Sequence, residues 1–303
     1  MALAEHDRGN GRPASGPRPP FVPGIGDSET LWNAARLGQR HVRMERARER
    51  ARVWERHEIK YLISEALAVE IRSFCRAHLP LDSHSACQPD HQYPVHSIYF
   101  DSADGQLLRS TLERRTNRVK LRVRTYRRFG EPDGTLPAFF EIKRKSNGLV
   151  RKTRARLPRH EAEPLTWNGF RLFRGSTDYA PSVCKNVNEF LSLRHQLGAR
   201  PAIGVFYTRE AYENHGIQGT RINIDRNLHY GLVNVADARQ RGVWWPVPMR
   251  GVILEIKFAN TFPAWVSHLI RETDLCRRGV CKYVMCFQAG KSLYGAKGVR
   301  LPV

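Results

Sequence analysis

The segment VKLRVRTY, residues 119–126, places cationic and apolar side chains on opposite faces of one predicted strand. Successive side chains of a β-strand point to opposite faces, so Lys120, Arg122, Arg124 and Tyr126 share one face and the intervening apolar residues share the other. A single strand of this kind is typical of an antiparallel sheet with one buried and one solvated face. Its meaning therefore depends on whether other strands repeat the pattern.

Five further segments do repeat it, each with charged residues on one face and apolar residues on the other. The charged faces carry Arg56, Glu58 and Lys60; Glu141, Lys143 and Lys145; Lys152, Arg154 and Arg156; Arg221, Asn223 and Asp225; and Glu255 and Lys257. If the apolar faces pack outward beneath helices, the charged faces converge on one interior. Two like charges 4 Å apart there repel by about 4 kcal/mol, so carboxylates or a bound polyanion must offset them.

The remaining pattern places a few helices around these strands. We expect helices at about 64–79, 101–113 and 263–276, and mostly helical structure within 158–199. We expect strands at about 54–63, 94–101, 117–128, 137–145, 149–157, 201–213, 219–229, 250–259 and 282–287. The predicted fold class is therefore α+β, an antiparallel β-barrel tunnel with a charged lumen, flanked by helices.

The N-terminal part of the chain has a different composition. Residues 1–26 are rich in Gly, Pro, Arg and Ser, which predicts disorder, and residues 28–53 mix charges of both signs at helical spacing. We therefore predict a disordered basic tail plus a charged helix over residues 1–53. The tunnel domain is expected over residues 54–290, with a C-terminal tail over residues 291–303.

The strong positive charge of the chain indicates which kinds of partner it can bind. The 303 residues carry a formal net charge of +21, with a pI near 10.3, which favours nucleic acid, an anionic membrane or a small polyanion as a partner. No run of aromatic residues is interleaved with the basic ones as in a stacking platform, so we expect no stable nucleic-acid complex. An Arg-rich interior suits phosphate, because the guanidinium fork binds phosphate oxygens bidentately.

The cysteines, histidines and apolar runs argue against a zinc site, a secretory signal and a transmembrane segment. The six cysteines include no CxxC pair, and no Cys/His cluster has zinc-site spacing. There is no N-terminal apolar signal region and no apolar run near 18 residues, so we expect no transmembrane segment and a cytoplasmic protein with free thiols. The carboxylates on the charged faces suggest a divalent cation that bridges phosphate oxygens, with Glu255 the best candidate and Glu58, Glu141 and Asp225 behind it.

An ordered set of segments resembles a known family. EIKYLI, SIYFDS, KLRVRTYRR, FFEIKRK, VFYTREAYE, TRINIDRNL, ILEIKF and CKYVM follow one another from about Glu55 to Phe287. In this order they resemble the VTC-type polyphosphate polymerase domain of the CYTH-like triphosphate tunnel metalloenzyme superfamily. No single segment is specific, but the ordered set covers roughly three quarters of the chain.

The resemblance implies roles for particular residues. Glu255 would hold the metal, Mn²⁺ or Mg²⁺, and Tyr207 would line the wall. Further substrate contacts would come from Lys120, Lys152 and Arg154. The residues that would bind the nucleotide triphosphate or the product chain during catalysis are Lys60, Arg122, Arg124, Lys143, Arg209, Arg221, Lys257 and Lys282.

One departure from the superfamily selects among its activities. The hydrolases carry ExExK on the first strand, whereas this strand has Arg56-x-Glu58-x-Lys60. The lost carboxylate favours polyphosphate synthesis, in which the γ-phosphoryl group of ATP passes to a growing polyphosphate chain. The expected partners are thus ATP and polyphosphate. A CYTH-type triphosphatase and a non-catalytic polyphosphate-binding protein remain as alternatives.

Overall fold

The computed structural model describes residues 56–126, 136–147, 149–168, 172–175, 179–214, 219–232, 243–259, 262–275 and 279–296. The tail and helix predicted over residues 1–53 lie outside these ranges. Residues 54–303 form a compact unit of their own.

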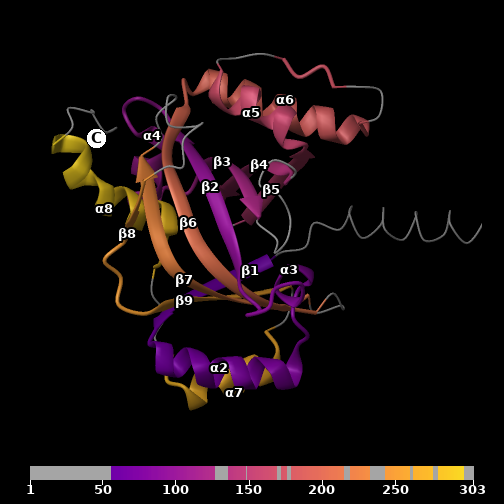
Figure 1. Cartoon of the computed structure of the whole chain (residues 1–303), viewed down its shortest axis with the longest axis vertical. Helices are drawn as coiled ribbons and strands as arrows, with labels where there is room; N and C mark the ends of the chain where they lie inside the picture. The colour runs from indigo at the N-terminus through magenta and orange to yellow at the C-terminus, as the bar shows by residue number, and fades with distance from the viewer. Residues whose placement is uncertain are drawn as a thin grey trace, which may run out of the picture. The chain divides into compact units, whose positions relative to one another are not determined.

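One antiparallel sheet contains all the described strands, in the order β1-β9-β7-β6-β2-β3-β4-β5, with β8 paired to β7 (Figure 1). The six segments that carry charged faces all lie in it. Its strands are β1 (Arg56–Ile63), β2 (Tyr93–Asp101), β3 (Arg118–Tyr126), β4 (Ala138–Ser146), β5 (Leu149–Leu157), β6 (Arg200–Glu213), β7 (Arg221–Leu232), β8 (Trp244–Pro246) and β9 (Val252–Ala259).

Helices cover the apolar face of this sheet in two places, and Figure 1 shows them as two pairs at opposite ends of the view. The helices are α2 (Glu65–His78), α3 (Ser83–Ala86), α4 (Gln106–Leu112), α5 (Arg159–Trp167), α6 (Pro181–Gln196), α7 (Ala264–Glu272) and α8 (Lys282–Ala296). Among the described residues no helix combines the length and apolar character needed to cross a bilayer.

The two helical layers bury separate cores. Helices α2 and α7 pack on β1, β9 and β7, with Ile71 of α2 and Ile256 of β9 fully buried. Helices α5 and α6 pack on β3, β4 and β5, with Phe190 of α6 and Leu121 of β3 fully buried. The apolar faces therefore point outward beneath helices, as the alternation predicts, and the charged faces point to the other side.

The sheet curls until distant strands meet. Strands β1 and β4 are six inter-strand spacings apart in the sheet, roughly 29 Å if the sheet were flat. Yet Nζ of Lys143 on β4 lies 2.7 Å from Oε2 of Glu58 on β1. The charged face is therefore concave and encloses a lumen, which confirms the predicted α+β antiparallel tunnel fold. Backbone pairing of the described strands ends at β1 and β5, and the Glu58–Lys143 contact joins β1 to β4 through side chains.

The strand predicted at residues 282–287 is wrong, because these residues begin the helix α8. Lys282, Tyr283, Cys286 and Phe287 are buried, and this spacing belongs to one helix face. A short apolar run cannot be assigned to helix or strand by periodicity alone. Helix α8 packs its apolar side chains against the concave face, where they share a core with β2, β6 and β7.

Candidate functional site

Strands β3, β4 and β5 build the first charged group of the lumen around Glu141. Antiparallel register places Glu141 directly between Arg122 on β3 and Arg154 on β5. Its Oε2 accepts a hydrogen bond of 2.6 Å from Nε of Arg122, and its Oε1 lies 2.6 Å from Nζ of Lys152 and 3.2 Å from Nε of Arg154. The carboxylate is only 1% exposed, so one buried anion holds three cations in place.

A second group, from β1, β9, β7, β6 and α8, surrounds Glu255. Its Oε1 lies 3.1 Å from Nζ of Lys60 and 2.9 Å from Nζ of Lys282. Its Oε2 lies 3.1 Å from Nζ of Lys257 and 3.4 Å from Nη2 of Arg209. Asn223 adds a side-chain hydrogen bond of 3.2 Å to the same oxygen.

Arg209 and Asp225 form a paired contact beside this group. Nε and Nη2 of Arg209 donate to the two carboxylate oxygens of Asp225 at 2.6 and 2.7 Å, which is the bidentate arrangement. Nζ of Lys282 approaches the same carboxylate to 2.6 Å. The ring of Tyr207 lies beneath both cations, 5.2 Å from the Arg209 guanidinium and 4.9 Å from the Lys282 ammonium.

The remaining predicted cations also lie on the concave face. Arg124 donates to Oγ of Ser97 at 2.9 Å, and Nζ of Lys120 lies 3.1 Å from Sγ of Cys281. Arg221 is held by Asp82, at 2.6 Å, and by Glu213. The fold thus brings together every residue predicted for the site, although the assignment of roles to them stays a prediction.

Among the described residues, the lumen carries an excess of positive charge. The carboxylates in contact with its cations are Asp82, Glu58, Glu141, Glu213, Asp225 and Glu255. The cations are Lys60, Lys120, Arg122, Arg124, Lys143, Lys152, Arg154, Arg209, Arg221, Lys257 and Lys282. Because Glu141 and Glu255 each contact several cations, the carboxylates fix the positions of the cations without neutralising their total charge.

The pKa values reflect this crowding. Burial alone would raise the pKa of Glu255, but Lys257, Lys282, Lys60 and Arg209 together hold it well below its usual range. Burial lowers the pKa of Lys257 to about 8, although Glu255 and Glu58 oppose the shift. Partial desolvation, with Arg122 and Arg154 nearby, lowers the pKa of Lys152 to about 8, although Glu141 opposes the shift and the side chain is 44% exposed. Both lysines are therefore still mostly charged at neutral pH, but they lose their charge at a lower pH than an ordinary lysine does.

The carboxylates of the lumen do not form a complete metal site. Both oxygens of Glu255 are already engaged by cations or by Asn223, and among the described residues no three potential His, Cys, Asp or Glu ligands come together. A divalent cation usually takes several oxygen ligands. The protein groups alone therefore do not fit a resident Mn²⁺ or Mg²⁺ ion.

Sequence reasoning missed an aromatic group at one side of the lumen. The ring of His84 on α3 stacks on Tyr126 of β3 at 5.1 Å, and Phe139 of β4 meets Tyr126 edge-on at 5.4 Å. Tyr93 of β2 lies 5.2 Å from His84. These rings come from four elements, so no pattern along a single segment could reveal the cluster.

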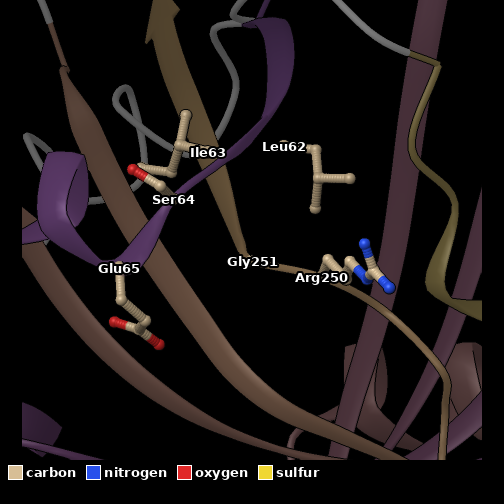
Figure 2. Close-up of a pocket in the computed structure, with 6 residues that line it drawn as sticks. All are labelled: Leu62, Ile63, Ser64, Glu65, Arg250 and Gly251. Atoms are coloured by element: carbon tan, nitrogen blue, oxygen red, sulfur yellow. The ribbon is translucent and has the colours of Figure 1, made fainter.

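Figure 2 shows a separate cavity of about 390 Å³ at the end of β1, lined by Leu62, Ile63, Ser64, Glu65, Arg250 and Gly251. Two of its polar groups already have structural partners. Oγ of Ser64 accepts from the backbone N–H of Leu67 and caps α2, and Glu65 lies 3.0 Å from Nε of Arg226. The cavity contains none of the predicted site residues, so the lumen remains the candidate site.

The lowered lysine pKa values predict that polyanion binding weakens as pH rises. A bound polyanion favours protonated Lys257 and Lys152, so binding takes up protons above pH 8. For each lysine the affinity for tripolyphosphate should fall by up to about tenfold per pH unit above 8. Calorimetry in buffers of different ionisation enthalpy measures both the affinity and the proton uptake. Affinity that stays constant from about pH 7.5 to 9.5 would contradict the assignment.

The variant Lys257→Arg is the matched control, because arginine stays charged throughout this range and should remove the part of the pH dependence that Lys257 contributes, leaving the part from Lys152. The unliganded protein should respond in the opposite sense. Because folding lowers the pKa of Lys257 below its usual value, the unfolded chain binds more protons between pH 8 and 10.5, and this lysine's contribution to stability rises with pH there.

Comparison with known proteins gives a family match. Residues 55–290 match the family model described as the VTC domain, which is more than half of the chain. No curated protein matches the chain. Among solved structures, the PH1819 protein from Pyrococcus horikoshii OT3 is 13% identical, with a TM-score of 0.41, over 77% of this chain and 98% of that chain. A putative adenylyl cyclase from Hippeastrum, HpAC1, described as having a dominant triphosphatase activity, is 15% identical, with a TM-score of 0.42, over 76% of this chain and 94% of that chain.

Proposed function

The chain belongs to the VTC domain family, and from this premise we propose that it transfers the γ-phosphoryl group of ATP to a growing polyphosphate chain inside its lumen. The observation that carries the proposal is the convergence of Lys and Arg side chains from β1, β3, β4, β5, β6, β7, β9 and α8 on one concave face. Phosphoryl transfer needs little covalent help from a protein, and positioning and electrostatic stabilisation supply most of the rate.

The chain's own residues would divide this work between the two charged groups. Arg122 and Lys152 beside Glu141, and Lys60 and Lys257 beside Glu255, would bind phosphate oxygens and hold donor and acceptor in line. Lysine ammonium groups swivel on flexible stems, so they can exchange a carboxylate for a phosphate without a backbone change. Any divalent cation would enter with the nucleotide as part of the substrate, since the protein groups alone do not fit a resident ion.

The position of Glu58 favours transfer over hydrolysis. The first strand has Arg56 where hydrolases have a glutamate, and the remaining carboxylate, Glu58, lies between Lys60 at 3.2 Å and Lys143 at 2.7 Å. Burial would raise the pKa of Glu58, but these lysines hold it below its usual range. A carboxylate held in this way is a poor base for activating water. An anionic acceptor, by contrast, would be attracted by the surrounding cations.

A product assay tests the proposal. Incubation with ATP and Mn²⁺ should release ADP in step with acid-labile polymer and with little free orthophosphate, because a bound acceptor gains an effective molarity on the order of 10⁵ M or more. Added salt should slow the reaction by screening the contacts to the polyanion. If orthophosphate or tripolyphosphate accounts for the released phosphate, a triphosphatase replaces the polymerase. If ATP is not consumed but polyphosphate binds tightly, the chain is a non-catalytic polyphosphate-binding protein.

A further inference from the structure

Arg154 on β5 is held flat against an aromatic ring. The central carbon of its guanidinium lies 3.8 Å from the centroid of the Phe139 ring and 5.5 Å from that of Tyr126. Along its edge, Nε lies 3.2 Å from Oε1 of Glu141, and Nη2 donates to the hydroxyl of Tyr126 at 3.2 Å. One stacking contact and two in-plane contacts therefore fix the orientation of the guanidinium plane.

Part of the Arg154 side chain remains exposed. The Arg154 side chain is 39% exposed, although Phe139 covers one face and Glu141 and Tyr126 occupy the edge. The exposed area therefore belongs to the parts of the side chain that these contacts leave uncovered, which include the Nη1 group and the face away from Phe139. Arg209 differs in its exposure: its guanidinium donates to Asp225, and its side chain is only 6% exposed.

The exposed part of Arg154 lies next to the cations that we propose to bind phosphate. Glu141, which contacts Arg154, also contacts Arg122 at 2.6 Å and Lys152 at 2.6 Å. A triphosphate on these two cations would place the group attached to its α-phosphate within reach of Arg154. In a nucleotide that group is a ribose with a planar base, and planar bases stack on guanidinium planes.

We propose that Arg154, supported by Phe139 and Tyr126, is the stacking platform for the base of a nucleoside triphosphate. This inference rests on the proposed function, and it deepens it by assigning the residue that selects a nucleotide over inorganic tripolyphosphate. Stacking reads the π-face that every base has, so the platform accepts adenine and guanine alike.

The alternative role for Arg154 is direct phosphate binding, as for its neighbours. That role needs free in-plane donors, because an arginine grips phosphate with its planar fork. Two of the five N–H donors of Arg154 are engaged by Glu141 and Tyr126. The remaining donors still permit phosphate contact, so an experiment must separate the two roles. The two roles also respond differently to lysine, which keeps the charge and loses the plane.

The variant Arg154→Lys separates these roles. Calorimetric titration of wild-type protein and of R154K with ATP, and separately with tripolyphosphate, should show ATP binding weakened by roughly 5- to 100-fold. Binding of tripolyphosphate should change by about twofold or less, because the charge is retained. GTP should behave as ATP does.

Two further variants complete the test. Arg156→Lys lies on the same face two residues along β5 and should leave the ratio of ATP to tripolyphosphate affinity unchanged. Phe139→Leu keeps Arg154 but removes its support, and should weaken ATP more than tripolyphosphate. Equal loss of both ligands in R154K, or no loss of either, would overturn the inference alone. Wild-type protein that binds neither ligand would overturn the proposed function together with it.

Discussion

Replacement of Glu255 by glutamine should lower the free energy of unfolding by about 3–5 kcal/mol, the usual range for breaking a buried ion pair. The carboxylate lies within 3.4 Å of Lys60, Lys257, Lys282 and Arg209. Glutamine keeps the shape but removes the charge, so these four cations are left facing one another. Their mutual repulsion in a poorly solvated lumen makes this the most damaging conservative change in the site.

The same variant should respond more strongly to a polyanion than the wild type does. Bound tripolyphosphate supplies the negative charge that the introduced glutamine lacks, so the increase in melting temperature on ligand addition should be larger in Glu255→Gln. This result would identify Glu255 as a group that organises cations. If Glu255 acted chiefly as a metal ligand, the variant would keep its stability and lose only metal-dependent activity.

Urea denaturation of the wild type and the variant, each with and without tripolyphosphate, measures both effects. Glu58→Gln is the control within the same lumen. Glu58 contacts only two lysines in the described structure and is 22% exposed, so its replacement should cost about 1 kcal/mol. Equal costs for the two variants would contradict the central place of Glu255.

Arg209→Ala should also destabilise the protein by about 3–5 kcal/mol. Arg209 and Asp225 are both buried, and Arg209 donates two short hydrogen bonds to the Asp225 carboxylate. Truncation leaves Asp225 with Lys282 as its remaining cation in the group. The change also removes the side chain that lies over Tyr207 and leaves a cavity there. Lys282 is a point charge and cannot replace the bidentate contact that Arg209 makes with Asp225.

A double-mutant cycle with Asp225→Asn measures the coupling between the two residues. If the pair acts as a unit, the double variant should cost clearly less than the sum of the single variants. The matched control is Arg144→Ala, because Arg144 contacts Glu189 at 2.7 Å while both side chains are about one third exposed. That exposed pair should contribute about 0–1 kcal/mol. Additive costs for Arg209 and Asp225 would show that burial alone, without pairing, explains the loss.

The strand alternation predicts much of this molecule because it is a local property. Lys120, Arg122 and Arg124 share a face whatever the strand order, and the apolar residues between them require a cover. The repetition of that pattern indicates a charged interior if the apolar faces pack outward, and the family resemblance strengthens that prediction. The resemblance then supplies candidate roles, which the alternation alone cannot.

The features that escape prediction depend on contacts between distant segments. The strand order, in which β1 pairs with β9 and β2 pairs with β6, is set by long-range packing. The start of helix α8 reads equally well as a strand, because residues 283–287 are apolar throughout and fit either period. The packing of Arg154 involves Phe139 from one strand and Tyr126 from another, and no spacing along the chain indicates it.

Because the contact between Glu58 and Lys143 is made by side chains alone, the width of the lumen can change there without breaking backbone hydrogen bonds. In a fully hydrogen-bonded barrel the circumference is fixed by strand number and stagger, and widening it means breaking a whole ladder. In the part of the chain that the structure describes, the Glu58–Lys143 ion pair, with side chains 22% and 39% exposed, connects β1 to β4. Such a pair is worth about 1 kcal/mol or less, so it can part at little cost. Under the proposed function, a narrow polyphosphate chain and a wider nucleotide could then occupy the same lumen at different widths.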